Sequence, residues 1–301
     1  MRILITGGMG FIGKHLVNYL IKKENTVTIF DNFSNSKREI DYFSKNKKIE
    51  IMEGDITELD NILNATKNID VVIHLAAKIS VNESIKNPSK TFHINVDGTK
   101  NVLKACEKNN VHKLIIASSA AIYGESISKN KINEKSSKNP ISPYGESKLM
   151  MENEIMKILS NNKNMDCVIL RFFNIYGIGQ TIEYAGVITK FLENILKNKP
   201  IEIFGDGLQT RDFVAVDDVV ESINNAIANG SRGIFNIASG NSITINELAK
   251  LMVLWSKKEI EIHHLDPRNG DIKYSAADIT LAKNELKYSP KHKIEKIKDF
   301  L

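Results

Sequence analysis

Short apolar stretches alternate with longer amphipathic ones over the first half of the chain. The apolar stretches RILIT, TVTIF, IEIME, VVIHLA, KLIIAS and CVILRFF are rich in β-branched residues. Such runs are typical of strands that are buried on both faces of a parallel sheet. Residues 11–22, 89–109 and 144–159 carry the apolar spacing of helices between these runs. The alternation predicts an α/β fold with a doubly wound parallel sheet.

After about residue 171 this rhythm loosens. A helical pattern covers residues 187–198, the short runs IEIF and FVAV follow, and a second helical pattern from residue 217 leads into IFNIAS. With 301 residues, of which 42% are hydrophobic, the chain is long enough for a large core and a second, smaller one. We therefore expect one domain in residues 1–170 and a smaller C-terminal α/β lobe in residues 171–301, interleaved with the last elements of the sheet.

Composition excludes several classes of protein. Cys106 and Cys167 match neither a metal-ligand spacing nor a disulfide framework, and the histidines are scattered, so we expect no metal. The first residues, MRILITGG, resemble a strand and not a secretory signal, and no apolar run reaches the roughly 18 residues of a membrane span. The net charge of +5 comes from scattered lysines and not from a basic block. We expect a cytoplasmic protein that binds neither membrane nor nucleic acid.

A glycine-rich turn, TGGMGFIG, follows the first predicted strand and opens the first predicted helix. Gly7, Gly10 and Gly13 permit a tight turn, close approach to a pyrophosphate and close helix packing. Asp31 lies at the end of the second strand, 18 residues after Gly13. A carboxylate there accepts hydrogen bonds from ribose hydroxyls and repels a 2′-phosphate, which favours NAD over NADP; the alternative is a strand-end cap. Asp55, after the third strand, either borders the adenine or caps the next helix.

The segment SPYGESK places Tyr144 and Lys148 four residues apart, on one face of a predicted helix. Lowering a tyrosine pKa from about 10 to about 7 needs about 4 kcal/mol. An ammonium about 4 Å away supplies about that much at an effective dielectric constant of about 20. Lys148, together with the positive nicotinamide ring of NAD⁺, is therefore expected to lower the pKa of Tyr144 so that it acts as a base. Upstream, Ser118 and Ser119 end a strand, and one of them is placed to hydrogen-bond the reacting oxygen.

Nine segments together resemble the extended short-chain dehydrogenase/reductases, in the NAD-dependent nucleotide-sugar epimerase and dehydratase branch. They are TGGMGFIG, FDNFS, GDI, HLAA, SSAAIYG, SPYGESK, RFFNIYG, GDGLQTRDFVAVDDVV and PRNGDIKYSAAD, in that order along nearly the whole chain. The resemblance implies a Rossmann-like fold. It also implies that Tyr144 is the catalytic acid and base, that Lys148 is its electrostatic partner and a ribose contact, and that Ser119 hydrogen-bonds the sugar O4.

The resemblance further implies two sets of binding residues. The NAD cofactor would be lined by Gly7, Gly10, Phe11, Ile12, Gly13, Asp31, Asn32, Asp55, Ile56, Leu75, Ala76, Ala77, Asn95, Tyr144, Lys148 and Phe173. The nucleotide sugar would contact Ser80, Ser119, Asn174, Val187, Arg211, Arg268, Asp271 and Ser275. Arg211 and Arg268 suit the diphosphate because a guanidinium fork matches phosphate oxygens.

Three positions bear on the reaction and the substrate. Ala120 and Ala121 follow Ser119 where the dehydratases and decarboxylases of this family resemble one another in having threonine and acidic residues, which donate protons during elimination. The chain is thus most similar to the UDP-glucose and UDP-GlcNAc 4-epimerases. Ser275 stands where the epimerases restricted to UDP-glucose have a large tyrosine, which implies room for an N-acetyl group. The alternative is that Ser275 reflects backbone packing alone.

The expected function is NAD-dependent 4-epimerisation of a UDP-hexose through a transient 4-keto sugar. Glucose, galactose and their N-acetylhexosamine forms are the expected sugars. Alternatives are a UDP-glucuronate 4-epimerase, a dehydratase, or a non-catalytic NAD-binding sensor. The helix that begins near Tyr144 continues LMMENEIMKIL, which is apolar on more than one face. This pattern predicts a homodimer through that helix and residues 89–109, or burial of the extra face beneath loops of the same chain.

Overall fold

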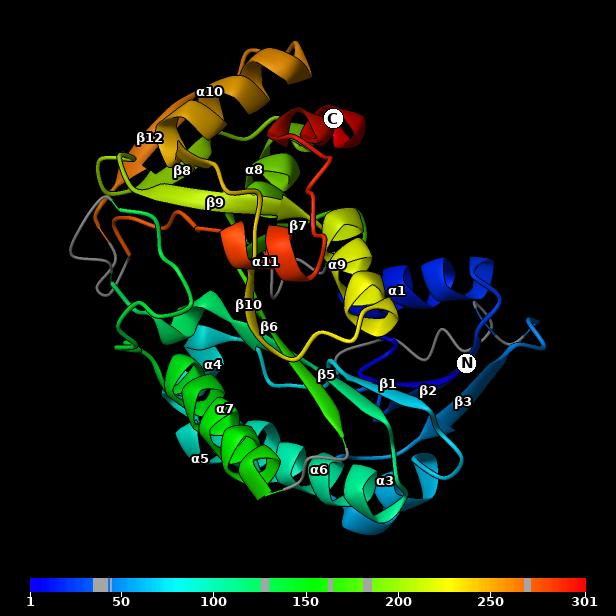
Figure 1. Cartoon of the computed structure of the whole chain (residues 1–301). Coiled ribbons are helices and arrows are strands. Elements are labelled where there is room, and N and C mark those ends of the chain that lie inside the picture. Colours follow the sequence, from blue (N-terminus) through cyan, green and yellow to red (C-terminus); the bar gives the residue numbers. More distant parts are fainter. Residues whose placement is uncertain (35–42, 44, 126–129, 162–164, 181–185, 268–271) are drawn as a thin grey trace.

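A parallel seven-stranded sheet forms the centre of the computed structural model, which describes residues 1–301 except 35–42, 44, 126–129, 162–164, 181–185 and 268–271 (Figure 1). The strand order is β10-β6-β5-β4-β1-β2-β3, and every neighbouring pair is parallel. The bounds are β1 (Arg2–Thr6), β2 (Thr26–Asp31), β3 (Ile49–Glu53), β4 (Val71–His74), β5 (Lys113–Ser119), β6 (Asp166–Phe172) and β10 (Gly233–Ile237). The predicted Rossmann-like α/β fold is confirmed.

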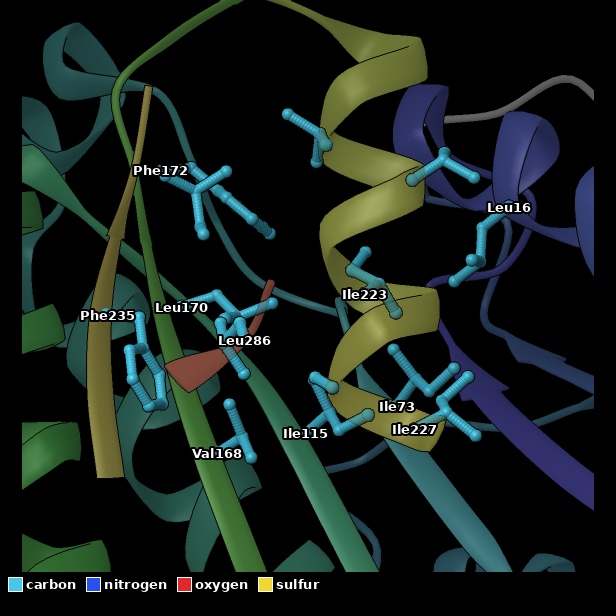
Figure 2. Packing of buried hydrophobic residues seen from close by; sticks show 14 of the residues in the cluster. Leu16, Ile73, Ile115, Val168, Leu170, Phe172, Ile223, Ile227, Phe235 and Leu286 are labelled. Carbon is cyan, nitrogen blue, oxygen red and sulfur yellow. The ribbon is translucent and has the colours of Figure 1, made fainter. Parts of the chain in front are cut away.

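Helices cover both faces of this sheet because alternate strand residues point to opposite sides. On one face, side chains of α1 (Phe11–Lys22) and α9 (Val216–Ala228) meet those of the strands, as Figure 2 shows for Leu16, Ile223 and Ile115. The short helix α11 (Thr280–Glu285) adjoins the same cluster. On the other face, α3 (Leu59–Ala65), α6 (Gly98–Lys108) and α7 (Pro143–Asn161) pack on the alternate residues, such as Leu4 and Ile116.

The predicted helix of residues 89–109 is interrupted by a π-helical turn. The chain forms α4 (Val81–Lys86), α5 (Pro88–Phe92), the π-helical η1 (His93–Asp97) and then α6. Pro88 starts α5, where its missing N–H would have no helical partner, and Asn87 caps the Lys90 N–H. Wider turns of this kind are frequent at functional sites. Here the turn carries Asn95, which is described below.

The second half of the chain builds two small sheets beside the large one. Strands β7 (Asn174–Tyr176), β9 (Thr210–Ala215) and β11 (Ser242–Thr244) form the first, and β8 (Ile201–Phe204) pairs with β12 (Ile262–Leu265) in the second. Helices α8 (Val187–Leu196) and α10 (Ile245–Ser256) pack on them around a third hydrophobic cluster, and η4 (Ile294–Phe300) closes it. Two elements of this half belong with the large sheet, because β10 pairs with β6 and α9 packs on its face. The division into residues 1–170 and 171–301 stays a prediction.

Within the parts of the chain that the structure describes, no helix combines the length and the apolar character that a bilayer crossing requires.

Candidate active site

The glycine turn between β1 and α1 has a conformation that requires glycine. Gly7 has φ +69°, and a Cβ atom there would lie 2.7 Å from the Ala76 nitrogen, so the turn packs directly on the backbone that follows β4. A Cβ atom on Gly13 would lie 2.5 Å from the Gly8 carbonyl oxygen. Gly10 is the N-cap of α1 and offers no side-chain cap, and none of the described first-turn residues of α1 is acidic. The first N–H groups of α1 therefore suit a pyrophosphate.

Asp31 ends β2 beside this turn. Its carboxylate accepts hydrogen bonds from the Met9 and Phe33 N–H groups, each at 2.9 Å. Burial raises the pKa of this carboxyl, while these two N–H groups act in the opposite direction. A carboxylate has about four acceptor positions, so the two internal bonds leave room for ribose hydroxyls. Asp31 thus caps the strand end, as the alternative interpretation held, and remains suited to bind ribose.

Asn32 and Asp55 join the ends of β2 and β3. The Asn32 amide donates to Asp55 Oδ2 at 2.8 Å, and Asp55 Oδ1 accepts from the Thr57 N–H at 2.9 Å. Asp55 therefore does stabilise the turn after β3, and its place beside Asn32 keeps it at the edge of the predicted cofactor site. The Ile56 side chain is buried, and a Cβ atom on Gly98 would lie 2.6 Å from its Cδ1. Any contact of Ile56 with a cofactor would therefore come from its main chain.

The other residues predicted to line the cofactor lie near the same strand ends. Leu75, Ala76 and Ala77 follow β4 and are half-buried. Phe11 and Ile12 begin α1. Phe173 follows β6 and is buried, with its ring centroid 6.3 Å from that of Tyr123, so packing accounts for its side chain. In doubly wound sheets ligands bind outside the carboxyl ends of the strands, and these residues occupy that edge.

Tyr144, Lys148 and Ser119 are brought together by α7 and β5. Tyr144 is in the first turn of α7, where its N–H donates to Ser84 Oγ at 3.1 Å and its phenol hydrogen-bonds Ser119. Lys148, one turn later, is buried, and its Nζ donates to the Ala117 carbonyl at 2.9 Å. Two turns of the helix therefore contact the last residues of β5. This is the arrangement that the spacing in SPYGESK predicts.

The predicted lowering of the Tyr144 pKa by Lys148 together with NAD⁺ stays a prediction, because it involves the bound cofactor. Burial raises the pKa of Tyr144 above its ordinary value, and the hydrogen bond from Ser119 lowers it by less. Burial also lowers the pKa of Lys148 to about 8, against the opposing effect of Glu152. The Lys148 ammonium also donates a hydrogen bond to the Ala117 carbonyl. The positive charge of a bound oxidised nicotinamide would act in the lowering direction.

A buried histidine links β1, β4 and α6 below the site. Thr99 Oγ1 uses its hydrogen to donate to the Asn95 carbonyl at 2.6 Å, so His74 Nε2, at 2.9 Å, must donate to Thr99. His74 Nδ1 then accepts from Thr6 Oγ1 at 2.7 Å. Burial lowers the pKa of His74 to about 3, and the nearby Lys148 charge acts in the same direction. The imidazole is therefore neutral and serves as a fixed structural link.

Asn95 connects the segment after β4 to the helix of Tyr144. Its Oδ1 accepts from the Lys78 N–H at 2.7 Å, and its Nδ2 donates to the Lys78 carbonyl and to Ser147 Oγ, both at 2.9 Å. Ser147 Oγ in turn donates to the Tyr144 carbonyl at 2.8 Å. The predicted cofactor contact of Asn95 is thus accompanied by a structural role, because the side chain orients both segments that flank the site.

Three predicted substrate residues gather around β9. The Asn174 amide donates to the Asp212 carbonyl at 3.0 Å, and Arg211 Nη1 donates to the Thr210 and Ile272 carbonyls at 2.8 and 2.5 Å. Ser275 is buried, and its N–H donates to Thr210 Oγ1 at 3.3 Å. The two remaining described positions, Ser80 and Val187, begin α4 and α8, where Ser80 Oγ caps the Glu83 N–H. Arg268 and Asp271 lie outside the described residues.

Asp212 is a buried residue of this lobe that the sequence analysis missed. Its carboxylate accepts from the N–H and the hydroxyl of Ser239 and from the N–H groups of Gly240 and Ala277. Burial raises its pKa to about 6 and outweighs these donors. The carboxylate therefore joins β9 to the turn after β10 and to the segment of Ser275. Its position between Arg211 and the predicted strand FVAV was the available signal.

Among the described residues, no three His, Cys, Asp or Glu side chains are grouped so that they could hold a metal ion.

Residues 3–238 match the model of the NAD dependent epimerase/dehydratase family. The chain belongs to this family. A putative UDP-glucose 4-epimerase of Methanocaldococcus jannaschii is 39% identical over 94% of this chain and 91% of its own length. The UDP-N-acetylglucosamine 4-epimerase structure of Methanobrevibacter ruminantium M1, in complex with UDP-N-acetylmuramic acid, is 34% identical, with a TM-score of 0.93 over 99% of this chain and 96% of that one.

A third relative extends the range of sugars. The UDP-glucuronic acid 4-epimerase structure of Bacillus cereus, in complex with UDP-glucuronic acid and NAD, is 30% identical, with a TM-score of 0.91 over 99% of this chain and 97% of that one. Membership of the family makes this chain an NAD-dependent enzyme of the UDP-sugar 4-epimerase and dehydratase type. Similarity does not choose among its sugars, because relatives with different sugars are similar to it to nearly the same degree.

The residues at the strand ends fit NAD. The close backbone packing at Gly7 and the uncapped N-terminus of α1 suit the pyrophosphate, and Asp31 retains acceptor positions for a ribose. The Asp31 carboxylate would repel the additional phosphate of NADP. The prediction that NAD is the cofactor is confirmed by the family.

Proposed function

We propose that this enzyme interconverts the two C4 configurations of a UDP-hexose, with NAD retained in the site through the whole reaction. The observation that supports this most is the hydrogen-bonded pair of Ser119 and Tyr144 with Lys148 one helical turn away. This arrangement supplies one proton acceptor and one hydroxyl to a single substrate oxygen. Simple oxidation and reduction at C4 requires no further acid or base.

In the proposed reaction the Tyr144 phenolate accepts the proton of the sugar 4-hydroxyl. The Ser119 hydroxyl hydrogen-bonds the same oxygen and orients it, and the Lys148 ammonium stabilises the phenolate. NAD⁺, held at the glycine turn and by Asp31, would supply the hydride acceptor for C4 and the hydride that returns to it. The 4-keto sugar turns in the site between these two events, so that C4 takes back its hydride on the other face. Tyr144 then donates the proton to the new hydroxyl.

The neighbours of Ser119 favour epimerisation over elimination of water. Ala120 and Ala121 begin the 3₁₀ turn η2 (Ala120–Ile122), and their methyl groups neither donate nor accept protons. The Ala121 N–H instead donates to Ser119 Oγ at 3.1 Å, which orients the serine hydroxyl. A dehydratase needs an acid for the leaving hydroxyl group. A non-catalytic NAD sensor, for its part, would gain nothing from the contacts of Tyr144 and Lys148 with β5.

A sugar that turns has to be held chiefly through its nucleotide. Binding energy from the diphosphate is then used to retain a ring that makes few fixed contacts. We propose that Arg211 on β9 provides one diphosphate contact. Its guanidinium is held by the Ile272 carbonyl, and the next residue, Asp212, fixes the strand through Ser239. Arg268 is proposed as the second contact from the sequence alone.

For the substrate we propose UDP-glucose and UDP-galactose together with their N-acetylated forms. Support comes from Ser275, whose small side chain is buried beside Thr210, next to Arg211. A tyrosine at that point would fill space next to the substrate lobe. A UDP-glucuronate substrate is the competing proposal, since a relative with that sugar has nearly the same fold.

Exchanging Ser275 for tyrosine is expected to lower kcat/KM for UDP-GlcNAc at least about tenfold relative to that for UDP-glucose, because the ring would occupy the space of the acetamido group. NMR of purified wild type and Ser275→Tyr, each with UDP-glucose, UDP-GlcNAc and UDP-glucuronate, measures the three rates. Identical UDP-GlcNAc to UDP-glucose ratios in both proteins would refute the argument from size. Turnover of UDP-glucuronate alone would establish the competing substrate.

The homodimer remains a proposal as well. It is supported by Met150 and Met156 on α7, which are 44% and 49% exposed, and by the position of α6 beside α7, where Lys100 lies 3.8 Å from Glu154. Two such helices from each of two chains would cover these methionines.

A further inference from the structure

A buried ion pair lies on the catalytic helix, one turn beyond Lys148. Glu152 follows Lys148 by four residues and Tyr144 by eight, so all three share one face of α7. Arg171 on β6 donates to Glu152 through Nε at 3.0 Å and through Nη2 at 2.7 Å. The side chains of Arg171 and Glu152 are only 1% and 3% exposed. The reaction as described above uses neither residue.

Stability alone does not explain why such a pair is present. Two charges removed from water are often replaced by well-packed apolar residues without loss of stability. The guanidinium makes two further hydrogen bonds, because Nη1 donates to Tyr123 Oη at 2.8 Å and to the Glu134 carbonyl at 3.0 Å. Arg171 is therefore fixed by several segments, and it in turn fixes the position of the Glu152 carboxylate.

The Glu152 carboxylate accepts a third hydrogen bond in addition to the two from Arg171. Glu152 Oε1 also accepts from Ser118 Oγ, at the end of β5. The residue before Ser118 is Ala117, whose carbonyl accepts from Lys148 Nζ. The residue after it is Ser119, which is hydrogen-bonded to Tyr144. Three successive residues of β5 thus meet three successive turns of α7. The contact of Ser118 with Glu152 sets how the strand end and the helix lie relative to each other.

The negative charge of Glu152 also acts on Lys148. Lys148 is buried, which disfavours its charged form, and the Glu152 carboxylate favours that form. His74 on β4 also faces Lys148 but is neutral. On elements packed against α7, Glu83 of α4 pairs with Lys78, and Asp97 of η1 and Glu154 of α7 lie near Lys100 of α6. Of the carboxylates that the structure describes, Glu152 is the one whose charge favours the protonated form of Lys148.

We propose that Glu152, held by Arg171 and Ser118, is a positioning residue that keeps Lys148 charged and keeps Ser119 in contact with Tyr144. The proposal rests on the function proposed above, since it assigns to the ion pair the task of maintaining the proton-transfer site. It gives the pair a role in the reaction that is separate from folding.

The direct test is the titration of Lys148 in the NAD-bound protein. Carbon NMR of protein labelled in its lysine side chains follows each amine, and Lys148→Arg identifies the Lys148 signal. In Glu152→Gln the titration midpoint of Lys148 is expected to fall by about one pH unit, and the alkaline limb of kcat should move with it. The matched control is Glu154→Gln, which removes a carboxylate two residues away that pairs with Lys157 at the surface. It should leave both the midpoint and the alkaline limb unchanged.

Glu152→Gln leaves the Arg171 charge buried without its partner, which destabilises the protein. The double variant Glu152→Met with Arg171→Met removes both charges together. It is expected to fold with a Tm near that of the wild type, to show the same lowered Lys148 midpoint and to lose at least about tenfold in kcat at neutral pH. A double variant that fails to fold, or one with an unchanged midpoint and kcat, would show that the pair serves structure alone.

The two proposals can fail separately. If the wild type converts none of the UDP-sugars while the Lys148 midpoint still falls in both variants, the reaction is misassigned and the role of Glu152 in charging Lys148 stands. If the wild type epimerises its substrate and the midpoint stays constant in both variants, the reaction stands and the role of Glu152 is refuted.

Discussion

Replacing Tyr144 by phenylalanine is expected to lower kcat about a thousandfold or more, because loss of a positioned acid and base removes about two to four orders of magnitude. NAD should remain bound in the variant, because the glycine turn and Asp31 lie on other elements. The hydrogen bond from the Tyr144 N–H to Ser84 belongs to the main chain and survives the substitution. Turnover of the UDP-sugar substrate by NMR and the NAD released on denaturation measure the two quantities.

The matched control is Tyr19→Phe, which removes a phenol hydroxyl from α1, a different element from those of Ser119 and Lys148. This variant should have wild-type kcat and NAD content. If Tyr144→Phe kept its full rate, another group would have to accept the proton, and the role given to the Ser119 and Lys148 contacts would be lost.

Exchanging Gly7 for alanine is expected to remove most of the bound NAD. At φ +69° a residue with a Cβ atom is strained by about 1–3 kcal/mol. In addition, that atom would lie 2.7 Å from the Ala76 nitrogen and 2.8 Å from its Cα, so the turn has to move away from the end of β4. The pyrophosphate site depends on this close approach. The NAD content of the purified variant and its affinity for added NAD provide the measurement.

Gly230→Ala is the corresponding control. A Cβ atom at Gly230 has no neighbour within 4 Å, and the residue is exposed after α9. It should retain NAD and the wild-type Tm. A Gly7→Ala protein with full NAD content would contradict the assignment of this turn to the cofactor.

The elements that make up the large sheet are predictable because their signal is local. The runs RILIT and IEIME coincide with β1 and β3, and the helical spacing of residues 11–22 coincides with α1. Where the chain departs from the pattern, a local cause is visible. The run VVIHLA ends as a strand at His74, because the following residues turn to pack against Gly7. The π-helical turn at Asn95 interrupts a helix whose apolar spacing gives no sign of it.

The positions of the three proposed catalytic residues were predictable for a similar reason. Tyr144 and Lys148 lie one helical turn apart, and Ser119 ends a recognisable strand. Their electrostatics were not predictable, because burial is a property of the folded chain. The spacing suggested that Lys148, together with the nicotinamide ring of NAD⁺, lowers the pKa of Tyr144. In the protein without NAD, burial raises the pKa of Tyr144 and lowers that of Lys148.

The supporting residues depend on contacts between distant segments. Asp212 meets Ser239 and Gly240 across a turn and Ala277 from a later segment, and no spacing rule connects these positions. The sequence signal for Glu152 was weak. A glutamate on the helix face of Tyr144 and Lys148 has to be paired if that face is buried. Its partner Arg171 could be found only once β6 was placed beside β5.

In the proposed reaction the hydrogen on C4 leaves as hydride and returns to the same carbon without exchanging with water. UDP-glucose that carries deuterium at C4, incubated in ordinary water with the purified protein and no added NAD, tests this by NMR of the product. The account predicts UDP-galactose in which C4 still carries deuterium. A product whose C4 hydrogen comes from water would contradict it, and so would a substrate that remains unchanged while the protein holds NAD.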